Sequence, residues 1–301
     1  MRRAAVLLLL GLVCASVLPG RESFDPERVL WSRLHYQASK FFITLNAEVE
    51  IETVGAAAVR EALVEPPEDD TLPPVEAGAV KVEIDSRLLG RENQLDLWVV
   101  PGSGATLQRS EVQRARRFER NHLRTYRYGL RGVHSFSSKP ATAAEVELPA
   151  TDWTDRDSSF DPFSLVMEPP LTVTEPSALF YLLSVADLSS RGDTLQVPIY
   201  FKGRIFSVAV SVASRTRIEA DFVRQNGGDE ERVSGDVDAI ELSLRSRTIE
   251  HGEQVPELEL LGLRGDISIY LDPELRVPIE LRGDLRIVGR GRIRLQRVEL
   301  R

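Results

Sequence analysis

The feature that most constrains the fold of this chain is an alternation of apolar and polar residues with a period of two. It is clearest at residues 41–52, where the odd positions are apolar and the even positions become polar from Thr44 onward. Successive side chains of a strand point to opposite faces, so this segment predicts a strand with one dry and one wet face. The same pattern recurs at residues 34–38, 80–85, 95–99, 205–212, 217–222, 239–247, 266–271, 277–281, 285–288 and 293–300.

Turn residues separate these segments. Asn226-Gly227-Gly228-Asp229 is typical of a hairpin turn, and Gly265, Gly283, Gly289 and Gly291 punctuate the last third of the chain. Residues 65–74 are rich in proline and acidic side chains, which indicates an exposed connection between strands. The pattern therefore predicts one β-rich domain over residues 21–301, with a first half at about 29–148 and a second half at about 194–300.

One segment, at about residues 175–188, departs from the period of two. Thr174 suits an N-cap, Glu175 suits the positive end of a helix, and Pro176 is tolerated in a first turn. One apolar face results, formed by Leu179, Leu182, Leu183 and Ala186. We therefore expect a mainly β fold, a long antiparallel meander that forms a strongly curved sheet or half-open barrel, with one central amphipathic helix on its concave side or mouth.

The first twenty residues resemble an export signal. Arg2 and Arg3 precede an apolar run, Ala4 to Val13, which is too short to span a bilayer, for which about 20 residues are needed. We expect cleavage between residues 15 and 23, a periplasmic location and no transmembrane span in the mature chain. Cys14, the only cysteine, leaves a lipid anchor open as an alternative.

Composition excludes several function classes. Lysine and arginine number 38 against 46 acidic residues, for a net charge of −8, so we expect no nucleic-acid binding. A lone cysteine at position 14 supports neither a disulfide scaffold nor a thiol enzyme. Metal-ligand spacing is absent from the four histidines, His35, His122, His134 and His251. The sequence therefore predicts no catalytic residues, no metal and no cofactor.

Three charged patterns have ordinary structural explanations. A basic stretch from Arg114 to Arg131 reads as a strand face paired with acidic loops, with an anionic lipid, glycan or partner site as the alternative. The acidic residues of 152–161 read as a solvated loop, because Phe160 and Val166 stand where a calcium loop needs Gly and Glu. Arg-Gly-Asp occurs at 191–193, 264–266 and 282–284, each time at an expected element boundary.

The second half of the chain resembles an exported bacterial family known as domain of unknown function 3108. The resemblance rests on Asp161-Pro162-Phe163-Ser164-Leu165 before the helix, and on Asp272 with Arg276-Val277-Pro278 near the end. It implies a β-rich periplasmic fold over about residues 29–300 and carries no catalytic residues. We interpret Asp272, Arg276 and Pro278 as turn and register devices, because aspartate bonds to local backbone and proline suits a strand start or edge.

Three functions remain compatible with these features. The first is a non-enzymatic envelope protein that binds an apolar or amphipathic ligand, such as a lipid, or an envelope protein. Its ligand would contact the concave residues Phe41, Ile43, Leu45, Phe206, Val208 and Val210 and the helix residues Leu179, Leu182 and Leu183. The second is a structural or interaction protein in which the helix plugs a filled core rather than covering a cavity. The third is an envelope-polymer hydrolase with paired carboxylates. Ligand, partner and oligomeric state are left open.

Overall fold

The computed structural model describes residues 24–40, 43–65, 76–163, 172–249, 257–285 and 289–301. The predicted signal peptide, Phe41 and the proline-rich connection at 66–74 lie outside the described residues, as does the side chain of Ile43. In the described part of the chain no helix is long and apolar enough to cross a membrane.

The predicted fold class is confirmed, because 63% of the described residues lie in strands of one large, mainly antiparallel sheet that is strongly curved and does not close into a regular barrel. The first eight strands are β1 (Trp31–Lys40), β2 (Ile43–Val54), β3 (Ala79–Leu88), β4 (Arg91–Val99), β5 (Thr106–Ala115), β6 (His122–Tyr128), β7 (Gly132–Lys139) and β8 (Asp155–Pro162). The last six are β9 (Thr194–Phe201), β10 (Arg204–Asn226), β11 (Asp229–Thr248), β12 (Leu263–Leu271), β13 (Pro278–Leu285) and β14 (Gly289–Leu300).

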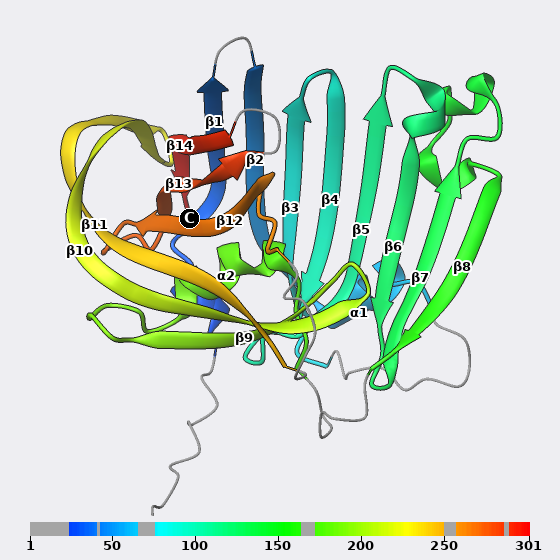
Figure 1. Cartoon of the computed structure of the whole chain (residues 1–301), viewed down its shortest axis with the longest axis horizontal. Coiled ribbons are helices and arrows are strands. Elements are labelled where there is room, and N and C mark those ends of the chain that lie inside the picture. The colour runs from blue at the N-terminus through cyan, green and yellow to red at the C-terminus, as the bar shows by residue number, and fades with distance from the viewer. Residues whose placement is uncertain (1–23, 41–42, 66–75, 164–171, 250–256, 286–288) are drawn as a thin grey trace, which may run out of the picture.

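The sheet consists of two meanders joined at the first and last strands. Its order is β8-β7-β6-β5-β4-β3-β2-β1-β14-β13-β12-β11-β10-β9. The predicted hairpin turn at Asn226–Asp229 connects the two longest strands, β10 and β11. These strands curl so far that the end of β10 returns to β14 and pairs with it in parallel, Val223–Gln225 against Arg297–Glu299 (Figure 1). Strands β10 to β14 therefore form a ring beside the broad sheet of β1 to β8.

The predicted helix lies between the ring and the broad sheet (Figure 1). It starts as a 3-10 turn at Pro176–Ala178 and continues as α2 (Leu179–Val185), which is shorter than the predicted 175–188. All seven residues of α2 are buried, including the two that carry hydroxyls. Tyr181 donates to the carbonyl of Phe24 at 2.6 Å, and the hydroxyl of Ser184 accepts from Trp31 Nε1 at 2.9 Å. Both flanks of the helix thus contact protein.

The segment at Asp272–Pro278 does more than set a turn. Asp272 accepts backbone hydrogen bonds from Glu274 and Leu275, as expected of a turn aspartate, and Pro278 begins β13. Arg276 reaches across to α2, where it donates to the carbonyls of Leu183, Ala186 and Leu188. Those carbonyls lie at and beyond the C-terminal end of the helix, where the last four carbonyl groups of any helix have no hydrogen-bond donor within the helix. Arg276 therefore anchors the helix to the ring.

Several elements were not predicted, among them strands β5, β7 and β9, helix α1 and the edge strand β8. Helix α1 (Ala56–Ala62) packs Val59 against Ala79, Trp98 and Leu107. Trp98 lies between Leu97 and Val99 of the main core, so this small cluster covers the opposite face of the sheet. The acidic segment predicted as a solvated loop is instead the edge strand β8, which pairs with β7 over its whole length. Backbone pairing is its main attachment, because nearly all of its side chains are exposed, and Asp161 adds a hydrogen bond from Tyr200.

Candidate functional site

The residues predicted to line a ligand cavity lie together in the core. The side chains of seven of them are described, each no more than 6% exposed and all in one buried cluster: Leu45, Leu179, Leu182, Leu183, Phe206, Val208 and Val210. The cluster joins the concave side of β2, helix α2 and the inner side of β10. Because the helix is buried on all sides, it fills the concave space of the sheet. Hollows that a ligand could enter lie at the margins of this core.

One such margin is the seam where the ring closes imperfectly. Strand β10 pairs with β14 only over Val223–Gln225, and just before that contact the two strands diverge. The gap forms a slot of about 270 Å³. Its lining residues come from β10, β13 and β14, and they are Glu219, Ala220, Asp221, Ile279, Glu280, Arg294, Leu295 and Gln296. Ala220, Ile279 and Leu295 also belong to the central core cluster, so the floor of the slot is apolar.

The rim of the slot carries a buried charge. Glu280 is only 2% exposed, and its carboxylate accepts from Arg294 Nε at 3.0 Å and from Arg282. Arg282 is held in turn by Tyr270, whose hydroxyl it contacts at 2.8 Å and whose ring lies 4.1 Å from the guanidinium carbon. A buried carboxylate is tolerated where both oxygens have charged partners. Among the described residues, the guanidinium of Arg294 donates no hydrogen bond other than that to Glu280, so both Nη groups remain available.

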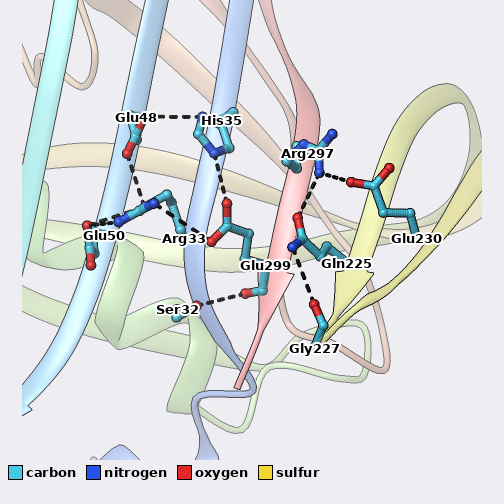
Figure 2. Close-up of polar contacts among 10 residues, drawn as sticks. All are labelled: Ser32, Arg33, His35, Glu48, Glu50, Gln225, Gly227, Glu230, Arg297 and Glu299. Carbon is cyan, nitrogen blue, oxygen red and sulfur yellow. Dashed lines mark hydrogen bonds and ion pairs between the residues drawn. The ribbon is translucent and has the colours of Figure 1, made fainter.

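A single arginine fastens the hairpin tip to β14 beside this slot. Figure 2 shows Arg297 contacting Glu230 of β11 at 2.5 Å and the side-chain oxygen of Gln225 of β10 at 2.7 Å. The Gln225 amide also donates to the carbonyl of Gly227 within the turn, at 3.4 Å. We call the contacts of Arg297 with Glu230 and Gln225 the tip latch. Together with three parallel residue pairs, it completes the ring.

Next to the tip latch, a ladder of ionic side chains crosses β2, β1 and β14 (Figure 2). His35 lies between Glu48 and Glu299, at 3.2 and 3.4 Å, and Arg33 contacts Glu48 at 3.0 Å and Glu50 at 2.7 Å. The hydrogen bond with Glu50 raises the pKa of Arg33 against the opposing effect of burial. Each carboxylate has a basic partner, and among the described residues no group of three or more acidic, histidine or cysteine side chains is arranged to hold a metal ion. The ladder therefore joins three neighbouring strands through ionic side chains.

A second buried acid lies at the start of α2. Glu175, 4% exposed, accepts a hydrogen bond from the hydroxyl of Tyr128, and its other oxygen lies 3.8 Å from Arg109 Nε. Burial raises its pKa to about 7, although Arg109 and Tyr128 favour the charged form. The sequence predicted Glu175 at the helix terminus but not its burial. The burial of Glu280 was not predicted either, because a glutamate between apolar neighbours in a strand is expected on the solvent face.

No protein-family model, curated protein or solved structure matches the chain.

Proposed function

We propose that this protein is an exported, non-enzymatic component of the cell envelope that binds a small amphipathic anion, a medium-chain fatty acid, at the seam of its ring. The export half of the proposal is supported by Arg2, Arg3 and the apolar run at 4–13, and by the resemblance to domain of unknown function 3108. The binding half is carried by one observation, which is the apolar floor of the seam slot beneath the available guanidinium of Arg294.

The dimensions of the slot select the ligand. Its volume of about 270 Å³ lies near the lower limit of small-molecule sites, which span roughly 300–1,000 Å³. The slot suits one short alkyl chain rather than a two-chain lipid. Ala220, Ile279 and Leu295 would contact the chain, and each buried methylene contributes about 0.8 kcal/mol to binding. Two of the three acids that line the slot already have basic partners, since Asp221 pairs with Arg232 and Glu280 pairs with Arg282 and Arg294. The ligand carboxylate would pair with the Nη groups of Arg294, whose side chain is 47% exposed at the rim.

Binding is tested by titrating the mature protein, purified without detergent, with sodium decanoate in an isothermal calorimeter. We expect saturable binding that Arg294→Gln weakens at least tenfold. Arg292→Gln is the matched control, because Arg292 is an exposed arginine two positions earlier on the same face of β14. Equal affinities of the two variants would contradict the assignment of the headgroup to Arg294, and absence of decanoate binding would overturn the proposed site.

The tip latch offers a second test of the same site. Gln225 and Glu299 are register partners on adjacent strands, which lie about 5 Å apart, so a Gln225→Cys/Glu299→Cys variant can form a disulfide. Locking the seam in this way should slow decanoate association, and reduction should restore it. Equal association rates in the oxidised and reduced forms would show that the slot admits its ligand without movement of the hairpin.

The alternative function is that of a structural or interaction protein without a small ligand. The observation that favours it is the complete burial of α2, which leaves the concave face occupied. Native mass spectrometry of the mature protein, purified without detergent, separates the two. A bound mass in the range of a medium-chain fatty acid supports the carrier, whereas a clean apo mass together with failed decanoate titration supports the structural protein.

A further inference from the structure

The face of the broad sheet that packs on α2 changes character beyond β4. Directly paired residues of neighbouring strands lie on the same face of a sheet. Leu97, on the apolar face, pairs with Arg109 of β5, which in turn pairs with Tyr126 of β6. It continues through Ser135 on β7 to Ser159 on β8. A second row runs parallel to the first, through Glu111, Arg124, Ser137 and Asp157. The concave face is therefore apolar over β1–β4 and polar along these two rows of β5–β8, whereas the neighbouring pair Tyr128 and Val133 is buried and apolar.

The polar part of this face is hollow. Three of its positions are serines, whose small side chains leave space between the larger side chains of Tyr126 and Arg124. The end of β9 approaches from the opposite side, and its residues Tyr200 and Lys202 complete a groove of about 350 Å³, which we call the serine groove. Beside the groove, Tyr128 of β6 and Val133 of β7 pack against Tyr200 of β9 and Ile205 of β10. No residue of α2 lines the groove, and it is separate from the seam slot.

The larger side chains of the serine groove are held in place from beneath. Tyr200 is 4% exposed and donates its hydroxyl to Asp161 at 2.7 Å, which fixes the orientation of that carboxylate. Burial and the hydrogen bond with Asp161 raise the pKa of Tyr200, so it remains a donor over the physiological range. Arg109 lies 5.4 Å from the ring centre of Tyr126 and supports it by a cation–π contact. The groove is therefore preorganised.

The chemistry of the groove selects against charged ligands. In formal charge, Arg124 and Lys202 balance Asp157 and Asp161 among the lining side chains, and Lys202 Nζ also lies 3.4 Å from Glu259, which is outside the groove. A free anion would meet the two carboxylates, and a cation the two basic groups. Within the described residues the hydroxyls of Ser135, Ser137 and Ser159 have no hydrogen-bond partner, and each can both donate and accept. Tyr126 adds an apolar ring face.

We propose that the serine groove binds a neutral, hydroxyl-rich sugar. Sugar hydroxyls donate to Asp157 and Asp161, accept from Arg124 and Lys202, and exchange both kinds of bond with the three serines. The ring of Tyr126 covers one apolar face of the sugar. This inference is independent of the seam slot, because no residue lines both hollows.

The test is a ¹H–¹⁵N NMR titration of the mature protein with tri-N-acetylchitotriose, which is neutral and is called chitotriose below, and separately with inorganic phosphate. We expect chitotriose to shift the amides of β6–β8 with a saturable, millimolar or tighter response, and phosphate to leave them unchanged. A Ser135→Val/Ser159→Val variant fills the groove with a side chain that suits strands, and it should weaken chitotriose binding at least tenfold. Ser234→Val, on an exposed part of β11, is the matched control and should bind as the wild type does.

Each alternative result overturns the inference. Shifts caused by phosphate but not by chitotriose would show an anion site, and absence of shifts with chitotriose would show that this neutral sugar does not bind. Unchanged chitotriose affinity in the filled variant, with its strands intact by circular dichroism, would place the sugar elsewhere. Decanoate titration of the filled variant should match the wild type, which separates this inference from the proposed seam site.

Discussion

Glu175 makes the stability of this protein depend on pH in an unusual direction. The carboxyl group is buried beside Tyr128 and Arg109, and burial raises its pKa from the ordinary value of 4.5 to about 7. The folded protein therefore holds the proton more tightly than the unfolded chain does. Stability contributed by protonated Glu175 is fully present below about pH 4.5 and is lost as the pH rises through about 7.

The size of the effect follows from the two pKa values. The difference between 4.5 and about 7 corresponds to about 3 kcal/mol, since one pKa unit corresponds to about 1.4 kcal/mol. The folded protein titrates mainly between pH 5 and pH 8. Over this range, linkage predicts that ionisation of Glu175 lowers the free energy of unfolding by about 2.5 kcal/mol. Asp96 adds a loss in the same direction, because burial raises its pKa to about 6. The contribution of Glu175 must therefore be isolated by comparison with a variant.

The variant is Glu175→Gln, which keeps an acceptor for Tyr128 and cannot ionise. We expect the difference in unfolding free energy between wild type and variant to fall by about 2.5 kcal/mol from pH 5 to pH 8, measured by urea unfolding with tryptophan fluorescence. Glu119→Gln, at an exposed position, should show no such change. A wild-type to Glu175→Gln difference that is the same at both pH values would refute the reasoning and show that Arg109 keeps Glu175 charged throughout.

Four further outcomes are expected. Leu182→Asp should yield little soluble protein, because truncating a buried leucine already lowers the free energy of unfolding by about 2–5 kcal/mol and the aspartate also buries a carboxylate. A melting temperature within a degree or two of wild type would contradict this. Arg276→Gln should lower the unfolding free energy by about 1–3 kcal/mol in urea, since three helix-end carbonyls lose a charged donor. Gly104→Ala should lower the free energy of unfolding more than Gly227→Ala does in the same assay. Both glycines have positive φ, but only at Gly104 would the new Cβ lie 2.7 Å from a Leu182 methyl. Deletion of residues 1–20 should leave folded protein in the cytoplasm, and uncleaved full-length chain in the inner membrane, detected by mass spectrometry, would contradict the export signal.

Alternation of side chains predicted most of the strands that border the core, but not β9, which contributes Leu195, Val197 and Ile199 to it. Val49 and Ile51 face the core and Glu48 and Glu50 face solvent, so the pattern of β2 matches its environment. The edge strand β8 has no such pattern, because Phe160 is its one large apolar residue and the strand is held by backbone pairing with β7. Helix α1 begins with three alanines and buries only Val59, which gives a weak periodic signal.

The candidate sites could not be predicted because they join residues far apart in the sequence. The seam slot depends on Ala220 meeting Leu295, and the tip latch on Gln225 meeting Arg297, and neither pair leaves a mark in local spacing. The serine groove depends on strand register, which turns Ser135 and Ser159 to one face across two strands. The burial of α2 on all sides depends on the curvature of both the broad sheet and the ring. No short segment of sequence specifies that curvature.

The pairing of β1 with β14 determines the order in which this chain can assemble. Trp31 lies opposite Leu300, so a junction in the middle of the sheet joins the first described strand to the last. Strands β2 to β8 can pair one after another as they leave the ribosome, because each follows its neighbour in the chain. β1 gains its second neighbour only when residues 289–300 have emerged, and the ring lacks β14 until then. Until that moment β1 presents an open edge to other chains. Nascent molecules stalled before Gly289 should consequently aggregate or be degraded, and a chaperone that shields β1 would be needed until β14 has emerged.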